Sequence, residues 1–331
     1  SVTEGFSFQL QFTPRRVDPV DCTLVLTARA EGGPTQTVEV AVQGAGEDEG
    51  PPTHEALAGV PSAVDVLMVV DDSASMQEEQ GALADVGAEF FDAADRHGVA
   101  VRVGVVTTDM SAPERSGRLV GMPAYFDPLA PGGLDRWEAR VQVGTAGSGQ
   151  EEGLAAARAA LIGNRNPGFR RPGAALAVVI LSDENDNSPE TVSTYLDGLL
   201  AAAGVAPAEV HLHAIVGAQN GRAQACSSQL GDADAGGRYV EAVGRLGGRV
   251  ESICAALAPG LSRIGEATFG VQRTFAVPPD LAGGVAAVWV DGSPVDGWSY
   301  DPALRVVRLA PEVFLSAGDT VLIVGAGDCA P

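Results

Sequence analysis

The hydrophobic and polar positions follow two different patterns along this chain. Between residues 62 and 266, short apolar runs alternate with segments whose apolar residues recur at helical spacing. The apolar runs are continuous, as in strands covered on both faces: VDVLMVV (64–70), VRVGVVTT (101–108), ALAVVILS (175–182) and EVHLHAIVG (209–217). Helices are predicted between them, the longest over 76–98. This alternation predicts an α/β fold with a doubly wound, mainly parallel sheet.

The two flanks alternate apolar and polar residues between turn residues, which predicts antiparallel β-strands. Examples are CTLVLTA and TVEVAVQG near the start, and VAAVWV and TVLIVG near the end. We therefore divide the chain into a β-sandwich segment (1–50), a linker (51–61), the α/β domain (62–266) and a β-rich segment (267–331). The flanks are either halves of one β-sandwich interrupted by the α/β domain or two separate β modules.

Composition narrows the function classes. A hydrophobic content of 45% with 19% charged residues is typical of a globular protein, and no apolar run is long enough for a membrane helix. A net charge of −22 disfavours nucleic acid and anionic membranes as partners. The chain contains no lysine, which excludes P-loop and Schiff-base lysine chemistry. We expect an exported, soluble protein whose signal or lipid anchor is not part of this sequence.

The four cysteines are widely spaced, without a CxxC motif or neighbouring histidines, so a zinc site is not expected. An even number suits two disulfides in an oxidising compartment. Cys226 and Cys254 flank a glycine-rich segment and are predicted to pair. Cys22 and Cys329 would then join the two ends of the chain.

Hard oxygen groups occur in three segments that lie at one edge of the predicted sheet: after two of the strands and before one of the helices. Because ligands of open parallel sheets bind beyond the carboxyl ends of the strands, these groups are expected to lie together. Carboxylates and hydroxyls without histidine or thiol are the ligands that Mg²⁺, Mn²⁺ and Ca²⁺ prefer. The groups are Asp71, Asp72, Ser73 and Ser75 after the first strand, Thr145 and Ser148 before a helix, and Asp183, Glu184 and Asp186 after the strand 175–182.

Helix capping offers an ordinary explanation for each group taken alone. SMQE (75–78) and SGQE (148–151) fit capping boxes, and Ser188 followed by Pro189 fits a helix start. The occurrence of all three at the same sheet edge favours a cation site. The run DENDNS is not an EF-hand loop, because Ser188 replaces the sixth-position glycine and Thr194 stands in place of the final glutamate.

The sequence DDSAS matches the DxSxS signature of the von Willebrand factor type A domain, and residues 62–266 resemble that family. The resemblance implies a metal-ion-dependent adhesion site with Asp71, Ser73 and Ser75 from the first loop and Asp183 from the third. The family's second-loop ligand is usually threonine, and Ser148 or Thr145 would take its place. Candidates to surround these ligands are Asp72, Asp109, Glu184 and Asp186. GSGQEEGL and SDENDNS are similar to bacterial surface and lipoprotein adhesins.

The resemblance implies a binding module rather than an enzyme. A cation held by few carboxylates keeps an open position that an acidic side chain of a protein partner can fill. We therefore expect an adhesion or protein-binding role at a bacterial cell surface or outside the cell. The alternatives are a metal-dependent hydrolase or phosphatase and a structural component of a surface assembly. No GxSxG motif or Ser-His-Asp arrangement is apparent, and His211 and His213, on one strand face, are interpreted as structural.

Overall fold

The computed structural model of this chain describes residues 20–29, 35–44, 52–281 and 284–326. The chain forms two compact units, of which the second spans Thr53–Asp328. In the first unit, β1 (Val20–Arg29) and β2 (Thr35–Gly44) form an antiparallel pair, with Val20 opposite Gly44. The expected Cys22–Cys329 disulfide falls outside the description, because Cys329 lies beyond the described residues.

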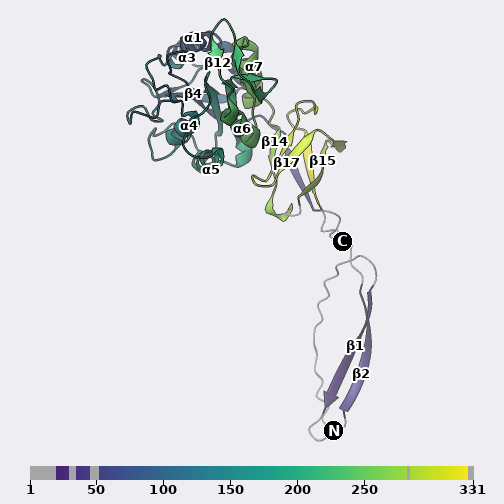
Figure 1. The fold of residues 1–331 in the computed structure, drawn as a ribbon. Helices are drawn as coiled ribbons and strands as arrows, with labels where there is room; N and C mark the ends of the chain where they lie inside the picture. The colour runs from purple at the N-terminus through teal and green to yellow at the C-terminus, as the bar shows by residue number, and fades with distance from the viewer. Residues whose placement is uncertain (1–19, 30–34, 45–51, 282–283, 327–331) are drawn as a thin grey trace. The chain divides into compact units, whose positions relative to one another are not determined.

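Within the second unit, a six-stranded sheet lies among the helices of the α/β domain (Figure 1). The strand order is β13-β8-β7-β4-β5-β6, and all neighbours are parallel except β5 and β6. The mixed α/β fold with mostly parallel strands is therefore as the sequence predicts. The strands are β4 (Ala63–Val70), β5 (Ala100–Thr107), β6 (Tyr125–Phe126), β7 (Ala175–Leu181), β8 (Val210–Val216) and β13 (Val250–Ser252).

Both faces of this sheet are covered, which explains why its strands are continuously apolar. On β4, Val66 and Met68 join a core with Phe90 and Trp137, while Leu67 faces the opposite core. That second core also holds residues of the helices α4, α5 and α6. The helices are α1 (Gln77–Asp85), α2 (Gly87–His97), α3 (Gly133–Val141), α4 (Gly153–Leu161), α5 (Val192–Ala203), α6 (Gly237–Leu246) and α7 (Leu257–Phe269).

The single helix predicted over 76–98 is divided at Val86 into α1 and α2. The indole N–H of Trp137 on α3 donates to the carbonyl of Leu83 at 3.2 Å, in the last turn of α1. Gly87 permits this approach, because a Cβ there would lie 2.4 Å from the Trp137 ring. The break thus depends on a tryptophan about fifty residues away, which local periodicity does not reveal.

Two antiparallel sheets form a β module. Its strand β3 precedes the α/β domain in the sequence, and its other strands follow that domain. One contains β14 (Thr274–Ala276), β17 (Trp298–Asp301) and β18 (Val306–Leu309). The other contains β3 (Thr53–Leu57), β15 (Val285–Val290), β16 (Ser293–Val295) and β19 (Thr320–Gly325). Side chains from both sheets, including Phe275, Val288 and Ile323, share one core.

The prediction of a linker over 51–61 is wrong at β3, because Thr53–Leu57 pair with β19. The α/β domain does interrupt a β module, but the N-terminal strand of this module comes from 53–57. In the described part of residues 1–50, β1 and β2 pair with each other and with no other strand. Among the described residues, no helix is long and apolar enough to cross a membrane.

Candidate functional site

Asp71 lies at the carboxyl end of β4 and is fully buried. Its Oδ1 accepts the backbone N–H of Ser73 at 2.8 Å, and its Oδ2 accepts the Ser182 hydroxyl at 2.6 Å. The hydroxyls of Ser73 and Ser75 lie 3.2 Å apart. Burial raises the pKa of Asp71, although these hydrogen bonds oppose the shift. The first loop thus places a buried carboxylate beside two hydroxyls.

The second loop is held against the first by backbone contacts. Gly147 N–H donates to the carbonyl of Asp72 at 2.8 Å, and a Cβ at Gly147 would lie 2.3 Å from the Asp72 carboxyl. Gln80 of α1 joins the same loops with its amide, which donates to the carbonyls of Asp71 at 2.8 Å and Gly144 at 2.9 Å. The position of the second loop therefore requires a glycine and a buried glutamine that the motif analysis did not single out.

The third loop follows β7 and carries Asp183, which is buried. Burial raises the pKa of Asp183 to about 6, the Ser75 hydroxyl lowers it, and the charge of Asp71 raises it further. The Oδ1 atom of Asp183 is buried and has no hydrogen-bond partner. The interactions of Asp183 with Ser75 and with the charge of Asp71 show that the first and third loops lie side by side.

Glu151 is a fully buried residue of the second loop that sequence analysis did not select. Neither of its carboxylate oxygens has a hydrogen-bond partner. Burial raises its pKa to about 8, with contributions from Glu184 and from the charge of Asp71. Its backbone carbonyl accepts the N–H of Asn187 in the third loop at 2.6 Å. Glu151 is therefore a buried carboxylate of the second loop whose pKa responds to the charge of Asp71.

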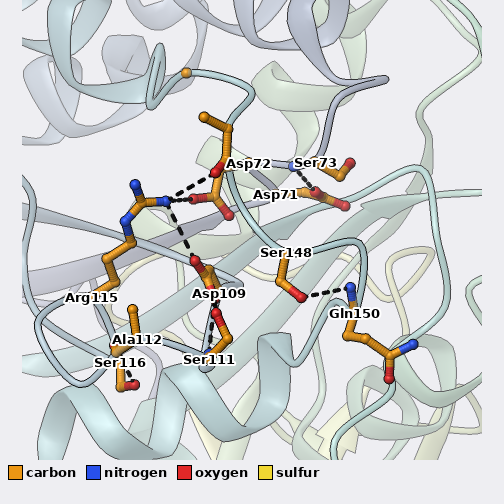
Figure 2. A network of polar contacts seen from close by, with 12 residues as sticks. Asp71, Asp72, Ser73, Asp109, Ser111, Ala112, Arg115, Ser116, Ser148 and Gln150 are labelled. Atoms are coloured by element: carbon orange, nitrogen blue, oxygen red, sulfur yellow. Dashed lines mark hydrogen bonds and ion pairs between the residues drawn. The ribbon is translucent and has the colours of Figure 1, made fainter.

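The two predicted second-loop ligands are less buried than Glu151. Ser148 is half-buried, and its hydroxyl accepts the N–H of Gln150 at 3.0 Å (Figure 2). Thr145 is also half-buried. The SGQE capping box is wrong, because α4 begins only at Gly153 and its N-cap, Glu152, makes no side-chain cap.

A second group of acids lies beside the site (Figure 2). Arg115 contacts Asp72 and Asp109 at 3.4 Å each. Burial and the charge of Asp109 raise the pKa of Asp72 to about 6, and Arg115 opposes the shift. Asp109 also accepts the N–H and hydroxyl of Ser111 at 2.8 and 2.6 Å. The half-exposed Arg115 is thus a cation that partly neutralises both acids.

Asp186 and Ser188 have structural partners. Asp186 accepts the N–H of Leu154 at 3.0 Å and pairs with Arg238 at 2.9 Å. The Ser188 hydroxyl accepts the N–H of Ala155 at 3.0 Å. Both side chains therefore cap α4 rather than α5, whose N-cap is Thr191. The Ser188–Pro189 helix start was a wrong prediction.

A disulfide-linked insertion borders the site. The predicted Cys226–Cys254 disulfide is confirmed. Inside it, Asp234 N–H donates to the carbonyl of Asp183 at 2.7 Å. Gly231 faces Glu79 of α1, a buried glutamate whose Oε2 has no partner. The insertion thus supports the third loop through its backbone.

The site contains more buried oxygen atoms that could bind a cation than positively charged side chains that could neutralise them. Unpartnered buried oxygens belong to Asp72, Glu79, Thr107, Thr108, Glu151 and Asp183. Buried carboxylates without partners are unfavourable unless they are protonated or a cation is present. Among the described residues, no three His, Cys, Asp or Glu side chains form a metal-holding group. A cation here would require hydroxyls among its ligands, as Ser73 and Ser75 provide.

Comparisons with known proteins identify no family. No protein-family model and no curated protein matches the chain. Similar solved structures include proximal thread matrix protein 1 from the mussel byssus, with 16% identity, 64% of this chain and 48% of that chain covered, and a TM-score of 0.39. The pilus adhesin SpaC from Lactobacillus rhamnosus GG has 12% identity, covers 94% of this chain and 43% of that chain, and has a TM-score of 0.39. Its open conformation gives 14% identity, 94% and 42% coverage, and a TM-score of 0.38.

The chain thus spans less than half the length of each of these structures. At these TM-scores and identities, the similarity assigns neither a family nor a function.

Proposed function

We propose that this chain is a von Willebrand A-type binding module that captures an acidic group of a protein partner through a divalent cation. The observation that carries the proposal is the convergence of oxygen groups from three loops around Asp71. The hydrogen bond from Ser182 to Asp71 and that from Gly147 to Asp72 bring these loops together. Open parallel sheets bind ligands beyond the carboxyl ends of their strands, which is where Asp71 and Asp183 lie, and this supports a site of this type.

Mg²⁺, or alternatively Mn²⁺ or Ca²⁺, fits the donors that are present. Asp71, Ser73, Ser75 and Asp183 would hold it, with the second loop contributing through Ser148, Thr145 or Glu151. These are carboxylate and hydroxyl oxygens, which hard cations prefer over nitrogen or sulfur ligands. The unpartnered oxygens of Asp183 and Glu151 support the assignment, because a cation would offset their burial.

The cation would supply an electrophilic position for the carboxylate of the partner. With hydroxyls among its ligands, the site would leave part of the cation's charge unneutralised. A partner acid could therefore bind despite the net charge of −22. The role proposed is binding at a cell surface or in the extracellular space, and the Cys226–Cys254 disulfide is consistent with an oxidising compartment.

Thermal unfolding with Mg²⁺, Mn²⁺ or EDTA tests the cation site. We expect each cation to raise the melting temperature of the wild type, because a ligand at 100 times its Kd stabilises the folded state by about 2.7 kcal/mol. Asp71→Ala, Asp183→Ala and Asp183→Asn should lose most of this increase. The exposed Asp197 of α5 provides a matched control, and Asp197→Asn should retain it. Equal increases in all variants would contradict the cation site.

Binding to immobilised peptides that carry a single aspartate or glutamate tests the partner chemistry. We expect retention in Mg²⁺ or Mn²⁺, loss of retention in EDTA, and no retention on matched asparagine and glutamine peptides. Cation binding without carboxylate-dependent retention would leave the metal site intact and remove the proposed mode of partner capture.

A further inference from the structure

A separate cavity of about 470 Å³ lies where the α/β domain meets the β module. Its walls come from β8, the turn between α6 and β13, the end of α7, β14 and the end of β18. None of the residues that line it belongs to the candidate metal centre. The volume is within the range of roughly 300–1,000 Å³ that is typical of small-molecule sites.

The charge of this cavity is opposite to that of the whole protein. The chain has 43 acidic and 21 basic residues, yet the cavity is lined by Arg249, Arg273 and Arg308 with Glu266 as its acid. Glu266 already forms an ion pair with Arg96. Three arginines therefore line one space, and a single acidic residue lines it with them.

The three arginines keep donors available. Among the described residues, the Arg249 side chain has no ion pair or hydrogen bond. Burial lowers the pKa of Arg273, and the nearby charge of Arg249 lowers it further. Arg273 is anchored by Nη1, which donates to the carbonyls of Ala310 and Val313 at 2.8 and 2.9 Å. A guanidinium carries five N–H donors, so these contacts leave Nε and Nη2 of Arg273 unengaged.

Arg308 has the same excess of donors. Its Nη2 donates to the carbonyl of Arg245 at 2.6 Å, and its Nη1 lies 3.7 Å from Asp301. Its Nε is buried without a hydrogen-bond partner. A buried donor on a cationic group is costly to leave unpaired. The second N–H of Nη2 has no partner among the described residues and remains available to an anion.

Two of the three histidines that line the cavity, His211 and His213, are buried and contribute walls rather than charge. The backbone N–H of Arg249 donates to Nδ1 of His213 at 3.0 Å. The His213 ring therefore carries its proton on Nε2, which lies 3.2 Å from the Thr268 hydroxyl. The Thr268 hydroxyl donates to the carbonyl of Ile264, and burial lowers the pKa of His213 to about 3. His211 contacts Gln272 at 2.9 Å. Around these two buried rings, the positive charge therefore belongs to the arginines.

We propose that this cavity binds a small organic anion that carries a phosphate or carboxylate group. Arg249, Arg273 and Arg308 would hold the anionic oxygens, because the planar guanidinium pairs with such groups through two parallel N–H bonds. Leu309 and Val271 provide an apolar surface for the remainder of the ligand.

Calorimetric titration with inorganic phosphate and with citrate, at constant ionic strength and in EDTA, tests this proposal. EDTA removes any contribution of cations bound near Asp71. We expect saturable binding of at least one of the two anions. The tighter one identifies the head group as phosphate or carboxylate. Arg249→Gln should weaken binding at least about tenfold, which corresponds to about 1.4 kcal/mol.

Arg136→Gln is the matched control, because Arg136 is exposed on α3 and outside the cavity lining. It removes the same charge and should bind the anion like the wild type. Arg249 lacks side-chain partners, so its substitution should preserve the fold, which circular dichroism verifies. Absence of saturable binding at millimolar concentrations, or equal weakening in both variants, would overturn the proposal.

Discussion

Glu151 shows how a single residue changes the chemistry of the candidate site. In the sequence it falls in the first turn of a predicted helix, where acidic residues are common because they complement the helix dipole. In the structure it precedes α4 by two residues and is fully buried, with both carboxylate oxygens unpartnered. Periodicity and capping patterns describe neighbours along the chain, so they do not indicate that a glutamate will be enclosed by other loops.

The burial of Glu151 predicts an unusual dependence of stability on pH. Its pKa rises from the ordinary value of 4.5 to about 8 on folding, so between these values the folded state retains a proton that the unfolded state releases. This contribution to stability is complete below pH 4.5 and is lost as the pH rises through 8. Glu151→Gln removes the effect and should be more stable than the wild type at high pH.

Urea unfolding in EDTA at pH 5 and pH 8.5 measures this difference. We expect the advantage of Glu151→Gln over the wild type to grow with pH, to about 1–3 kcal/mol at the higher value. The exposed Glu138 of α3 provides the control, and Glu138→Gln should show no such trend. A constant difference at both pH values would mean that Glu151 is not protonated in the folded protein at neutral pH.

Among the elements, β4 shows what a pattern of apolar residues conceals. VDVLMVV predicts this strand correctly, but Asp65 inside it is fully buried. Its carboxylate contacts Arg170 at 2.8 Å and Arg171 at 2.7 Å, and it also accepts the N–H of Arg171. The charge is tolerated inside the strand because two arginines more than a hundred residues away neutralise it.

Substitution of Asp65 should therefore be severely destabilising. We expect Asp65→Asn to lower the free energy of unfolding by about 3–5 kcal/mol, because two partly buried guanidinium groups lose their counter-charge. Asp92→Asn is the comparison, because Asp92 pairs with Arg96 on the exposed face of α2 and should cost less than about 1 kcal/mol. Chemical denaturation of both variants distinguishes the two effects. Similar losses would show that the buried triad contributes no more than a surface pair.

At the scale of the whole molecule, chain connectivity and cross-links decide the arrangement. The β module obtains a strand from each side of the α/β domain, because β3 pairs with β19. The Cys226–Cys254 disulfide links residues 28 positions apart and encloses the insertion whose Asp234 N–H contacts Asp183. The stability of the third loop is thereby coupled to a covalent cross-link.

Loss of this disulfide should destabilise the protein. For a loop of this length, the chain-entropy model predicts that Cys226→Ser with Cys254→Ser lowers the unfolding free energy by about 3–4 kcal/mol. A non-reducing peptide map should recover the Cys226–Cys254 peptide pair from the wild type. Thermal unfolding with and without a reductant measures the effect. An unchanged melting temperature after complete reduction would contradict it.

The sequence by itself determined the four strands β4, β5, β7 and β8, the paired cysteines and the three oxygen-rich loops, because each depends on local periodicity or on a short motif. It did not indicate the short strands β6 and β13 at the sheet edges. The tertiary structure decided the break at Val86, the role of β3, the capping of α4 by Asp186 and Ser188, and the burial of Glu151. It also collected Arg249, Arg273 and Arg308 around one cavity. These features depend on contacts between residues far apart in the chain, and the free energy of such contacts is not contained in any local segment.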